Sequence, residues 1–194
     1  MEFISNFLVE TSHIVNHLDK NKILDAIHLI KKMKDEKGRL FIIGVGGSSA
    51  NSSHAVNDFR KLCNIEAYSP TDNISEITAR TNDEGWETVF SEYLKVSKLN
   101  SKDLLLILSV GGGNLDKKIS ENICNAIIFA KSTNTKTIGI VGRTDGYTAN
   151  NSDVTVLIPE TSVSNLTPHS ESFQSIIWHL VVMHPLLKEN KTKW

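Results

Sequence analysis

A histidine and a carboxylate in this sequence lie at a spacing that suits a shared metal ion. His54 and Asp58 are four residues apart, and residues at that spacing in a helix lie on one face. An imidazole nitrogen and a carboxylate oxygen are both suitable zinc ligands. The pair therefore predicts half of a divalent-metal site, while the alternative of an ordinary solvated or structural pair stays open because short motifs recur without function.

A second pair near the end of the chain could complete such a site. Glu171 and His179 are eight residues apart, which places them about 80° apart around a helix axis. Two helices that each contribute two ligands can build a four-ligand site that is open to substrate. The other histidines in helical segments lack a comparable carboxylate partner, and we expect them to be structural: His13, His17, His28 and His184.

Two glycine-rich segments predict ligand-binding loops. Residues 44–49 read Gly-Val-Gly-Gly-Ser-Ser and follow the apolar run 40–43, and residues 109–114 read Ser-Val-Gly-Gly-Gly-Asn and follow the apolar run 104–108. Ligands of a parallel sheet bind beyond the carboxyl ends of its strands, where glycine lets backbone N–H groups approach an anion. One such loop alone is equally well explained as a tight turn. Two of them favour a small molecule that carries phosphate.

Neither loop matches a nucleotide-binding motif fully. No Gly-Lys-Ser or Gly-Lys-Thr follows either glycine segment, and the dinucleotide fingerprint fails where its last glycine would be Ser49. Glu66 lies roughly where a ribose-binding acid would be expected. The sequence therefore weakens a nucleotide-binding interpretation without removing it.

The elements that must position these residues alternate between strands and helices. Apolar runs predict strands over 40–43, 104–108, 137–141 and 154–158. Apolar stripes predict two leading helices, a helix over 84–99, a helix that carries Leu115, Ile119, Ile123 and Ile127, and a last helix from Thr167 to about residue 185. This alternation predicts an α/β fold with a doubly wound parallel sheet. We expect a loop over 160–166 and a frayed tail over 188–194.

Composition limits the classes of protein and partner. The chain has 194 residues, 40% hydrophobic and 22% charged, which fits one domain. Its 21 Lys and Arg against 22 Asp and Glu give no basic excess for nucleic acid or an anionic membrane. We see no secretory signal at the start and no apolar run near the roughly 20 residues that span a bilayer. Cys63 and Cys124 predict free buried thiols and a cytoplasmic location.

The ordered combination of these motifs resembles a known family. The motifs are Gly46-Gly47-Ser48, His54 with Asp58, Thr81-Asn82-Asp83, the loop 109–114, and Glu171 with His179. Together they are similar to sugar isomerase (SIS) domains and, more narrowly, to phosphoheptose isomerases, also called sedoheptulose 7-phosphate isomerases. The resemblance covers almost the whole chain. It implies one flavodoxin-like SIS domain over 1–194 with a five-stranded parallel sheet, its leading helices in 1–38 and its α/β core in 39–187.

The resemblance also implies an activity and an assembly. It implies a cytoplasmic homotetramer that holds one zinc ion per subunit. The implied reaction converts sedoheptulose 7-phosphate to D-glycero-D-manno-heptose 7-phosphate for bacterial lipopolysaccharide or capsule.

Residue roles follow from the resemblance position by position. Asp58 and His179 correspond to the catalytic pair. The implied metal ligands are His54, Asp58, Glu171 and His179. The implied substrate contacts are Gly46, Gly47, Ser48, Asp83, Ser109, Gly111, Gly112, Gly113, Asn114 and Glu171.

The sequence departs from the family pattern at the site itself. Asp58 stands where the family has glutamate, and Glu171 where it usually has glutamine. The family loop Ser-Thr-Ser-Gly-Asn-Ser is here Ser-Val-Gly-Gly-Gly-Asn, so Val110 and Gly111 remove two hydroxyls. The phosphate site is therefore expected to be weaker or differently shaped. An isomerase of another sugar phosphate, or a non-catalytic sugar-phosphate-binding SIS protein, remains an alternative.

Overall fold

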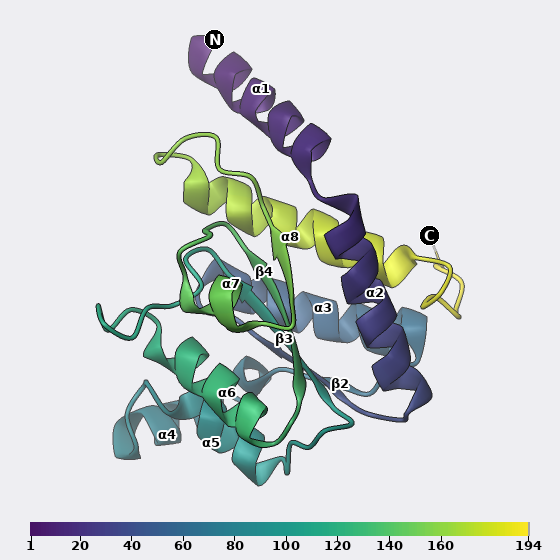
Figure 1. Ribbon diagram of the computed structural model, residues 1–194, viewed down its shortest axis with the longest axis vertical. Helices are drawn as coiled ribbons and strands as arrows, with labels where there is room; N and C mark the ends of the chain where they lie inside the picture. Colours follow the sequence, from purple (N-terminus) through teal and green to yellow (C-terminus); the bar gives the residue numbers. More distant parts are fainter. Residues whose placement is uncertain (194) are drawn as a thin grey trace.

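The computed structural model describes residues 1–193, which form a five-stranded parallel sheet between two layers of helices (Figure 1). The elements in chain order are α1 (Glu2–His17), α2 (Lys20–Asp35), β1 (Leu40–Ile43), α3 (Gly47–Cys63), β2 (Ala67–Tyr68), η1 (Pro70–Asp72), α4 (Ile74–Asp83), α5 (Val89–Val96), β3 (Leu104–Ser109), α6 (Glu121–Ser132), β4 (Lys136–Val141), α7 (Tyr147–Asn151), β5 (Val154–Leu157) and α8 (Leu166–Met183). The strand order is β2-β1-β3-β4-β5. This is the flavodoxin-like order, so the α/β, doubly wound prediction is confirmed.

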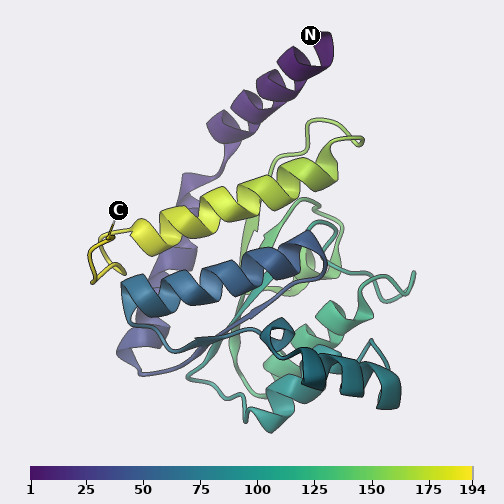
Figure 2. The ribbon, with the colours of Figure 1, turned by 180° about the vertical axis from the view of Figure 1, so that it is seen from behind.

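The strands send alternate side chains into two separate apolar layers. Leu40 and Ile42 pack with residues of α2, α3 and α8, whereas Phe41 and Ile43 pack with residues of α5 and α6. Alternate residues of a strand point to opposite faces, so a strand covered on both faces is apolar throughout. Figure 2 shows α3 and α8 side by side over one face of the sheet.

The two glycine loops leave the same edge of the sheet. Strand β1 pairs with β3 in parallel, with Ile43 level with Ile107. The chain therefore enters residues 44–49 and 109–114 from neighbouring carboxyl ends. In this strand order the winding direction reverses between β1 and β3, and ligands bind at such a switch point. The predicted position of both loops is confirmed.

At the amino edge of the sheet, a buried carboxylate joins the segments that lead into β1 and β3. Asp103 accepts hydrogen bonds from the backbone and guanidinium of Arg39, which precedes β1, and from the backbone and side chain of Asn100. The Asp103 side chain is 2% exposed. Because removing one partner leaves buried groups unsatisfied, this contact is expected to stabilise the fold substantially.

We expect Asp103→Ala to lower the free energy of unfolding by about 3 kcal/mol, as for other broken buried ion pairs. The measurement is urea unfolding followed by circular dichroism. Asp35→Ala is the matched control because Asp35 pairs with Lys31 at the surface, where such a pair contributes less than about 1 kcal/mol. Equal losses in the two variants would contradict the structural role of Asp103.

The helix predicted over 84–99 is wrong in its extent. It begins only at Val89, and a separate helix, α4, precedes it. Gly85 lies between them with a φ of 93°, a conformation that glycine adopts far more easily than other residues. The chain therefore turns at 84–88, where the sequence stripe predicted a continuous helix.

The helix predicted to carry Leu115 and Ile119 also begins later. Helix α6 starts at Glu121, and Asn114 and Ile119 form an isolated antiparallel bridge before it. Leu115 and Ile119 are exposed. Residues 114–120 therefore form a loop that projects from the carboxyl edge of the sheet, and only the second half of the predicted stripe is helical.

Smaller differences occur at β2, at α8 and at the tail. The resemblance implied a fifth strand, but the residues of the two-residue strand β2 were not predicted, and α8 begins at Leu166 with Asn165 as its N-cap residue, before the predicted start. The tail is not frayed throughout, because the backbone N–H groups of Glu189 and Asn190 donate to the carbonyl of Leu62. Residue 194, the end of the predicted tail, lies outside the described residues.

Helix α1 extends away from the rest of the molecule (Figure 1). A polar contact ties it to α8: Asn165 Nδ2 donates to Glu10 Oε2 over 2.8 Å, and His169 Nε2 lies 2.8 Å from the same oxygen. The Phe7 ring packs on the His169 ring, with centroids 4.3 Å apart. The contact fixes the direction in which α1 leaves the domain.

The attachment of α1 is expected to weaken in acid. The hydrogen bonds from Asn165 and then His169 hold the pKa of the Glu10 carboxyl below its usual range. A lowered pKa means that the contact stabilises at neutral pH and is lost as the pH falls below about 4.3 and through the lowered value. Hydrogen-exchange protection of residues 2–17, taken relative to the intrinsic exchange rate at each pH, should fall over that interval in wild type, and Glu10→Gln should already show less protection at pH 7. Unchanged exchange in the variant would contradict this role.

Candidate active site

Helices α3 and α8 lie against each other over most of their length. Asn51 Nδ2 donates to the backbone carbonyl of Glu171 over 2.9 Å, and Ser175 Oγ donates to Asn51 Oδ1 over 2.5 Å. Further along, the Cys63 thiol donates to the carbonyl of Val182 over 3.4 Å. The two helices therefore run in the same direction: residues early in α3 contact residues early in α8, and the ends of the two helices contact each other.

This pairing brings two histidines and a carboxylate together. His54 Nε2 lies 3.9 Å and His179 Nε2 lies 3.8 Å from Asp58 Oδ2. One ligand atom from each of the three residues lies within 4.8 Å of the others. These separations exceed hydrogen-bond length. The two distances to Asp58 Oδ2 fall just within the about 4 Å that can separate two atoms each about 2 Å from one ion, so a small inward movement of the side chains would bring all three atoms onto a metal ion.

The surrounding groups orient the ligand atoms. His179 Nδ1 lies 2.8 Å from the carbonyl oxygen of Ser175. A carbonyl only accepts hydrogen bonds, so Nδ1 carries the proton and the lone pair of Nε2 faces Asp58. Asn57 Nδ2 donates to Asp58 Oδ1 over 2.8 Å, which leaves Oδ2 directed at the histidines.

A buried tryptophan supports both imidazoles. The Trp178 ring stacks on His179 with centroids 3.6 Å apart, and the edge contact with His54 has centroids 4.7 Å apart. Trp178 is fully buried, whereas the side chains of His54 and His179 are 57% and 46% exposed. The two imidazoles are therefore exposed to solvent on one side and packed against a buried ring on the other.

Glu171 lies outside this group. A Cβ atom built on Gly47 would clash with Glu171 Oε2, so the carboxylate lies against the first turn of α3. His179 is eight residues further along α8, which corresponds to about 12 Å along a helix. The described chain thus brings together three of the four predicted metal ligands, and the metal role of Glu171 stays a prediction.

The second glycine loop forms one wall of a pocket of about 320 Å³. The backbone N–H of Gly112 donates to Ser109 Oγ over 3.0 Å, so the serine hydroxyl shapes the loop itself. Gly112 and Gly113 have φ values of 74° and 80°, which favour glycine. Gly111 and Asn114 line the pocket. At Gly111 the loop is open, because a Cβ atom there would meet no atom within 4 Å.

The remaining predicted substrate residues are more scattered. Gly46 precedes α3 with a φ of 64°, and Ser48 is buried in its first turn. Asp83 lies at the exposed end of α4, where Asn82 Nδ2 donates to Asp83 Oδ1 over 2.7 Å. Their contacts with substrate stay predictions.

The structure argues against the nucleotide interpretation. Glu66 precedes β2 and accepts a hydrogen bond from the Tyr68 hydroxyl over 2.8 Å. It therefore lies at the amino end of that strand, whereas ribose-binding acids act at the carboxyl ends.

Cys63 and Cys124 are free and buried as predicted, and burial raises the pKa of the Cys63 thiol to about 11.

Comparison with known proteins places this chain in a family. The sequence model of the SIS domain matches residues 2–142. A phosphoheptose isomerase of a Nitratiruptor species is 30% identical over 162 residues, which are 80% of this chain and 80% of that protein. The chain belongs to the phosphoheptose isomerase family of SIS domain proteins.

Other members of the family agree with this assignment. A phosphoheptose isomerase of Helicobacter pylori is 27% identical over 161 residues, which are 80% of this chain and 78% of that protein. The solved phosphoheptose isomerase from Neisseria gonorrhoeae superposes with a TM-score of 0.80 at 21% identity over 93% of this chain and 95% of that chain. At that identity the superposition shows the shared SIS fold.

Some residues of this SIS protein were not singled out from its sequence. Trp178 and Ser175 support the histidines from within α8, and Arg143 and Lys117 line the pocket of the second glycine loop. Arg143 could have been found, because it follows the predicted strand 137–141 at the edge where ligands bind.

No helix among residues 1–193 has both the length and the apolar character needed to cross a bilayer.

Proposed function

We propose that this protein is an aldose–ketose isomerase that converts sedoheptulose 7-phosphate to D-glycero-D-manno-heptose 7-phosphate. The observation that carries the proposal is the group of His54, Asp58 and His179 in a member of the phosphoheptose isomerase family. The product would enter bacterial heptose biosynthesis for lipopolysaccharide or capsule. We place the enzyme in the cytoplasm, in line with its two free buried thiols.

The donor set fits one zinc ion per subunit. Two imidazole nitrogens and a carboxylate oxygen are common ligands of catalytic zinc, which keeps a further position open for substrate. His54, Asp58 and His179 would hold the ion, and Glu171 would join only if its side chain or α8 moved. Bound zinc would polarise the sugar carbonyl and stabilise the negative charge that develops on its oxygen.

The acid–base work falls to Asp58 and His179. Conversion of the ketose removes a proton from carbon 1, forms an enediol and returns a proton to carbon 2, while the hydroxyl proton passes from one oxygen to the other. Asp58 Oδ2 and His179 Nε2 lie 3.8 Å apart, so a sugar bound against the exposed side of the group can contact both. The exposed side of the group lets a sugar enter, and the Trp178 ring holds the imidazole in place.

We expect the protein to bind one zinc ion per chain and to lose turnover on chelation. His54→Ala should weaken zinc binding by at least about tenfold, because three ligands become two. His28→Ala is the matched control, since His28 is exposed on α2 and lies outside the metal group. Calorimetric titration of zinc into chelator-treated protein measures the zinc affinity of each variant. Equal zinc affinity in the two variants would rule out His54 as a ligand.

We further propose that the protein is a homotetramer. Helix α1 leaves large apolar side chains in solvent, and the outer side of α8 does so next to the metal group: Phe3, Ile4, Leu8, Val9, Val15, Ile176, Leu180 and Met183. Apolar surface of this extent favours contact between subunits. Light scattering after gel filtration should give four chain masses, and a monomer at all concentrations would overturn this part of the proposal.

A sugar-phosphate-binding protein without catalysis is the second candidate. The absence of hydroxyls at Val110 and Gly111 favours it, because the loop then holds phosphate through fewer side chains. The distinguishing test is incubation of zinc-loaded protein with sedoheptulose 7-phosphate, with thermal stability and product both measured. Product formation supports the isomerase, whereas stabilisation without product supports the binding protein.

A further inference from the structure

The pocket beside the second glycine loop also has a charged wall. The wall is formed by Lys117, from the projecting loop 114–120, and by Arg143 and Asp145, which follow β4. The glycine side is open, because a Cβ atom built on Gly111 would meet no atom within 4 Å. The pocket therefore offers room, backbone and charge at the edge of the sheet where ligands bind.

Arg143 pairs with Asp145 at the exposed rim of the pocket. Its Nε and Nη2 atoms donate to the two carboxylate oxygens of Asp145, each over 2.8 Å. A guanidinium has five N–H donors in one plane, so three remain available after this pairing. The hydrogen bonds from Arg143 hold the pKa of the Asp145 carboxyl below its usual range, and the charge of Lys117 acts in the same direction.

The charges of this wall leave a surplus that suits an anion. Two cations, Arg143 and Lys117, face one carboxylate, Asp145. Bidentate binding by a preoriented guanidinium is a strong mode of phosphate recognition. The backbone N–H of Lys117 donates to Asn114 Oδ1 over 2.9 Å, which ties this part of the loop to the glycine segment.

We propose that Arg143 and Lys117 bind the phosphate group of the sugar in this pocket and supply the contacts that Val110 and Gly111 cannot make. Asp145 positions the guanidinium. This inference rests on the proposed function for the identity of the sugar, and it adds two specificity-determining residues to the site. It also explains how the loop can lose two hydroxyls and still select a phosphorylated substrate.

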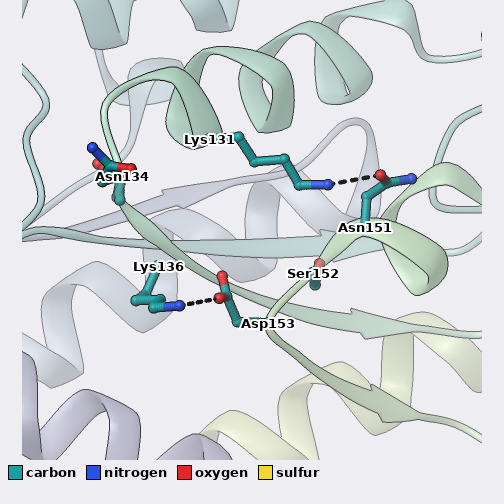
Figure 3. A pocket seen from close by; sticks show the side chains of 7 residues that line it. Lys131, Asn134, Lys136, Asn151, Ser152 and Asp153 are labelled. Atoms are coloured by element: carbon teal, nitrogen blue, oxygen red, sulfur yellow. Dashed lines mark hydrogen bonds and ion pairs between the residues drawn. The ribbon is translucent and has the colours of Figure 1, made fainter.

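Another polar pocket provides the contrast (Figure 3). It has a volume of about 440 Å³ and is lined by Lys131 and Lys136. Lys131 Nζ donates to Asn151 Oδ1 over 2.7 Å, and Lys136 Nζ pairs with Asp153 over 2.5 Å (Figure 3). Lys136 begins β4, so this pocket lies at the amino edge of the sheet, away from the glycine loops. Its lysines serve as controls for charge loss.

The test compares Arg143→Gln, Lys117→Gln and the control Lys131→Gln in the full-length protein. Binding of inorganic phosphate and of sedoheptulose 7-phosphate is measured by calorimetry with chelator present, and kcat and KM are measured on the zinc-loaded enzyme. We expect Arg143→Gln to raise both dissociation constants and KM by on the order of 10- to 100-fold, the range for a charge-assisted hydrogen bond. Its kcat should change by less than about threefold, because the contact is made equally before and during reaction.

A smaller effect in the same direction is expected for Lys117→Gln and none for Lys131→Gln. Affinity for unphosphorylated sedoheptulose should be the same in all variants. Phosphate binding that is absent in wild type, or equal in Arg143→Gln and Lys131→Gln, would overturn the inference even if the enzyme isomerises the sugar. If wild type shows no isomerisation but Arg143→Gln alone loses phosphate affinity, the proposed function fails and the phosphate site stands.

Discussion

The His179→Ala variant is expected to lose isomerase turnover by at least about 100-fold and to bind zinc more weakly. The expectation follows from the position of Nε2, which lies 3.8 Å from Asp58 Oδ2 with its lone pair directed into the group. Loss of a general acid–base group typically costs about 10²- to 10⁴-fold in rate. Initial rates with sedoheptulose 7-phosphate and zinc titration of the same preparation measure both losses.

The same substitution should leave the fold intact. The His179 side chain is 46% exposed, and the buried residue of this pair is the neighbouring Trp178. Thermal unfolding should therefore change little, as in His28→Ala, whose histidine is exposed on α2. Turnover that survives in His179→Ala would remove this histidine from the mechanism.

The second large effect is expected for Asp58→Asn. The substitution keeps the size of the side chain and removes its charge, so both zinc binding and proton transfer should suffer. We expect kcat to fall by at least about 100-fold, with weaker zinc binding measured by titration. Asp25→Asn on α2 is the control, because Asp25 forms an exposed pair with Lys22 away from the metal group.

The Asp58→Glu variant separates the charge from its position. It places the carboxylate one methylene further from the backbone, as the resemblance to the family implies for this position. Because a displacement of about 1 Å can change a rate on the order of 100-fold, the variant should retain zinc but differ from wild type in kcat. Full activity in Asp58→Asn would contradict the catalytic role, whatever the result for Asp58→Glu.

The fold was predictable where local pattern and burial agree. The runs 40–43 and 104–108 are apolar at every position because both faces of β1 and β3 are covered, and the structure buries all of these residues. Strand β2 has only two residues and carries no such pattern. The spacing of apolar residues predicted that Leu115 and Ile119 lie in a helix, but they lie in a loop. That spacing does not reveal the backbone turns at Lys118 and Ser120.

The candidate site was predictable in part for a similar reason. The spacing of His54 and Asp58 predicted a shared face, and the structure places both beside His179. The predicted angle between Glu171 and His179 describes their positions around the helix axis and not their distance along it. The way α3 packs against α8 places Glu171 beside Gly47, away from the histidines. That register depends on long-range contacts such as Asn51 with Ser175. Arg143 and Lys117 line one pocket only because two loops that are distant in the sequence lie close together.

In the proposed function, this protein moves a proton between neighbouring carbons of a sugar phosphate by means of its histidine–aspartate group. The most direct measurement is an NMR time course of zinc-loaded protein with sedoheptulose 7-phosphate in D2O, with a chelated sample beside it. We predict an aldoheptose phosphate that carries deuterium at carbon 2 and that does not form after chelation. Binding of the sugar phosphate with neither product nor deuterium exchange would contradict the account.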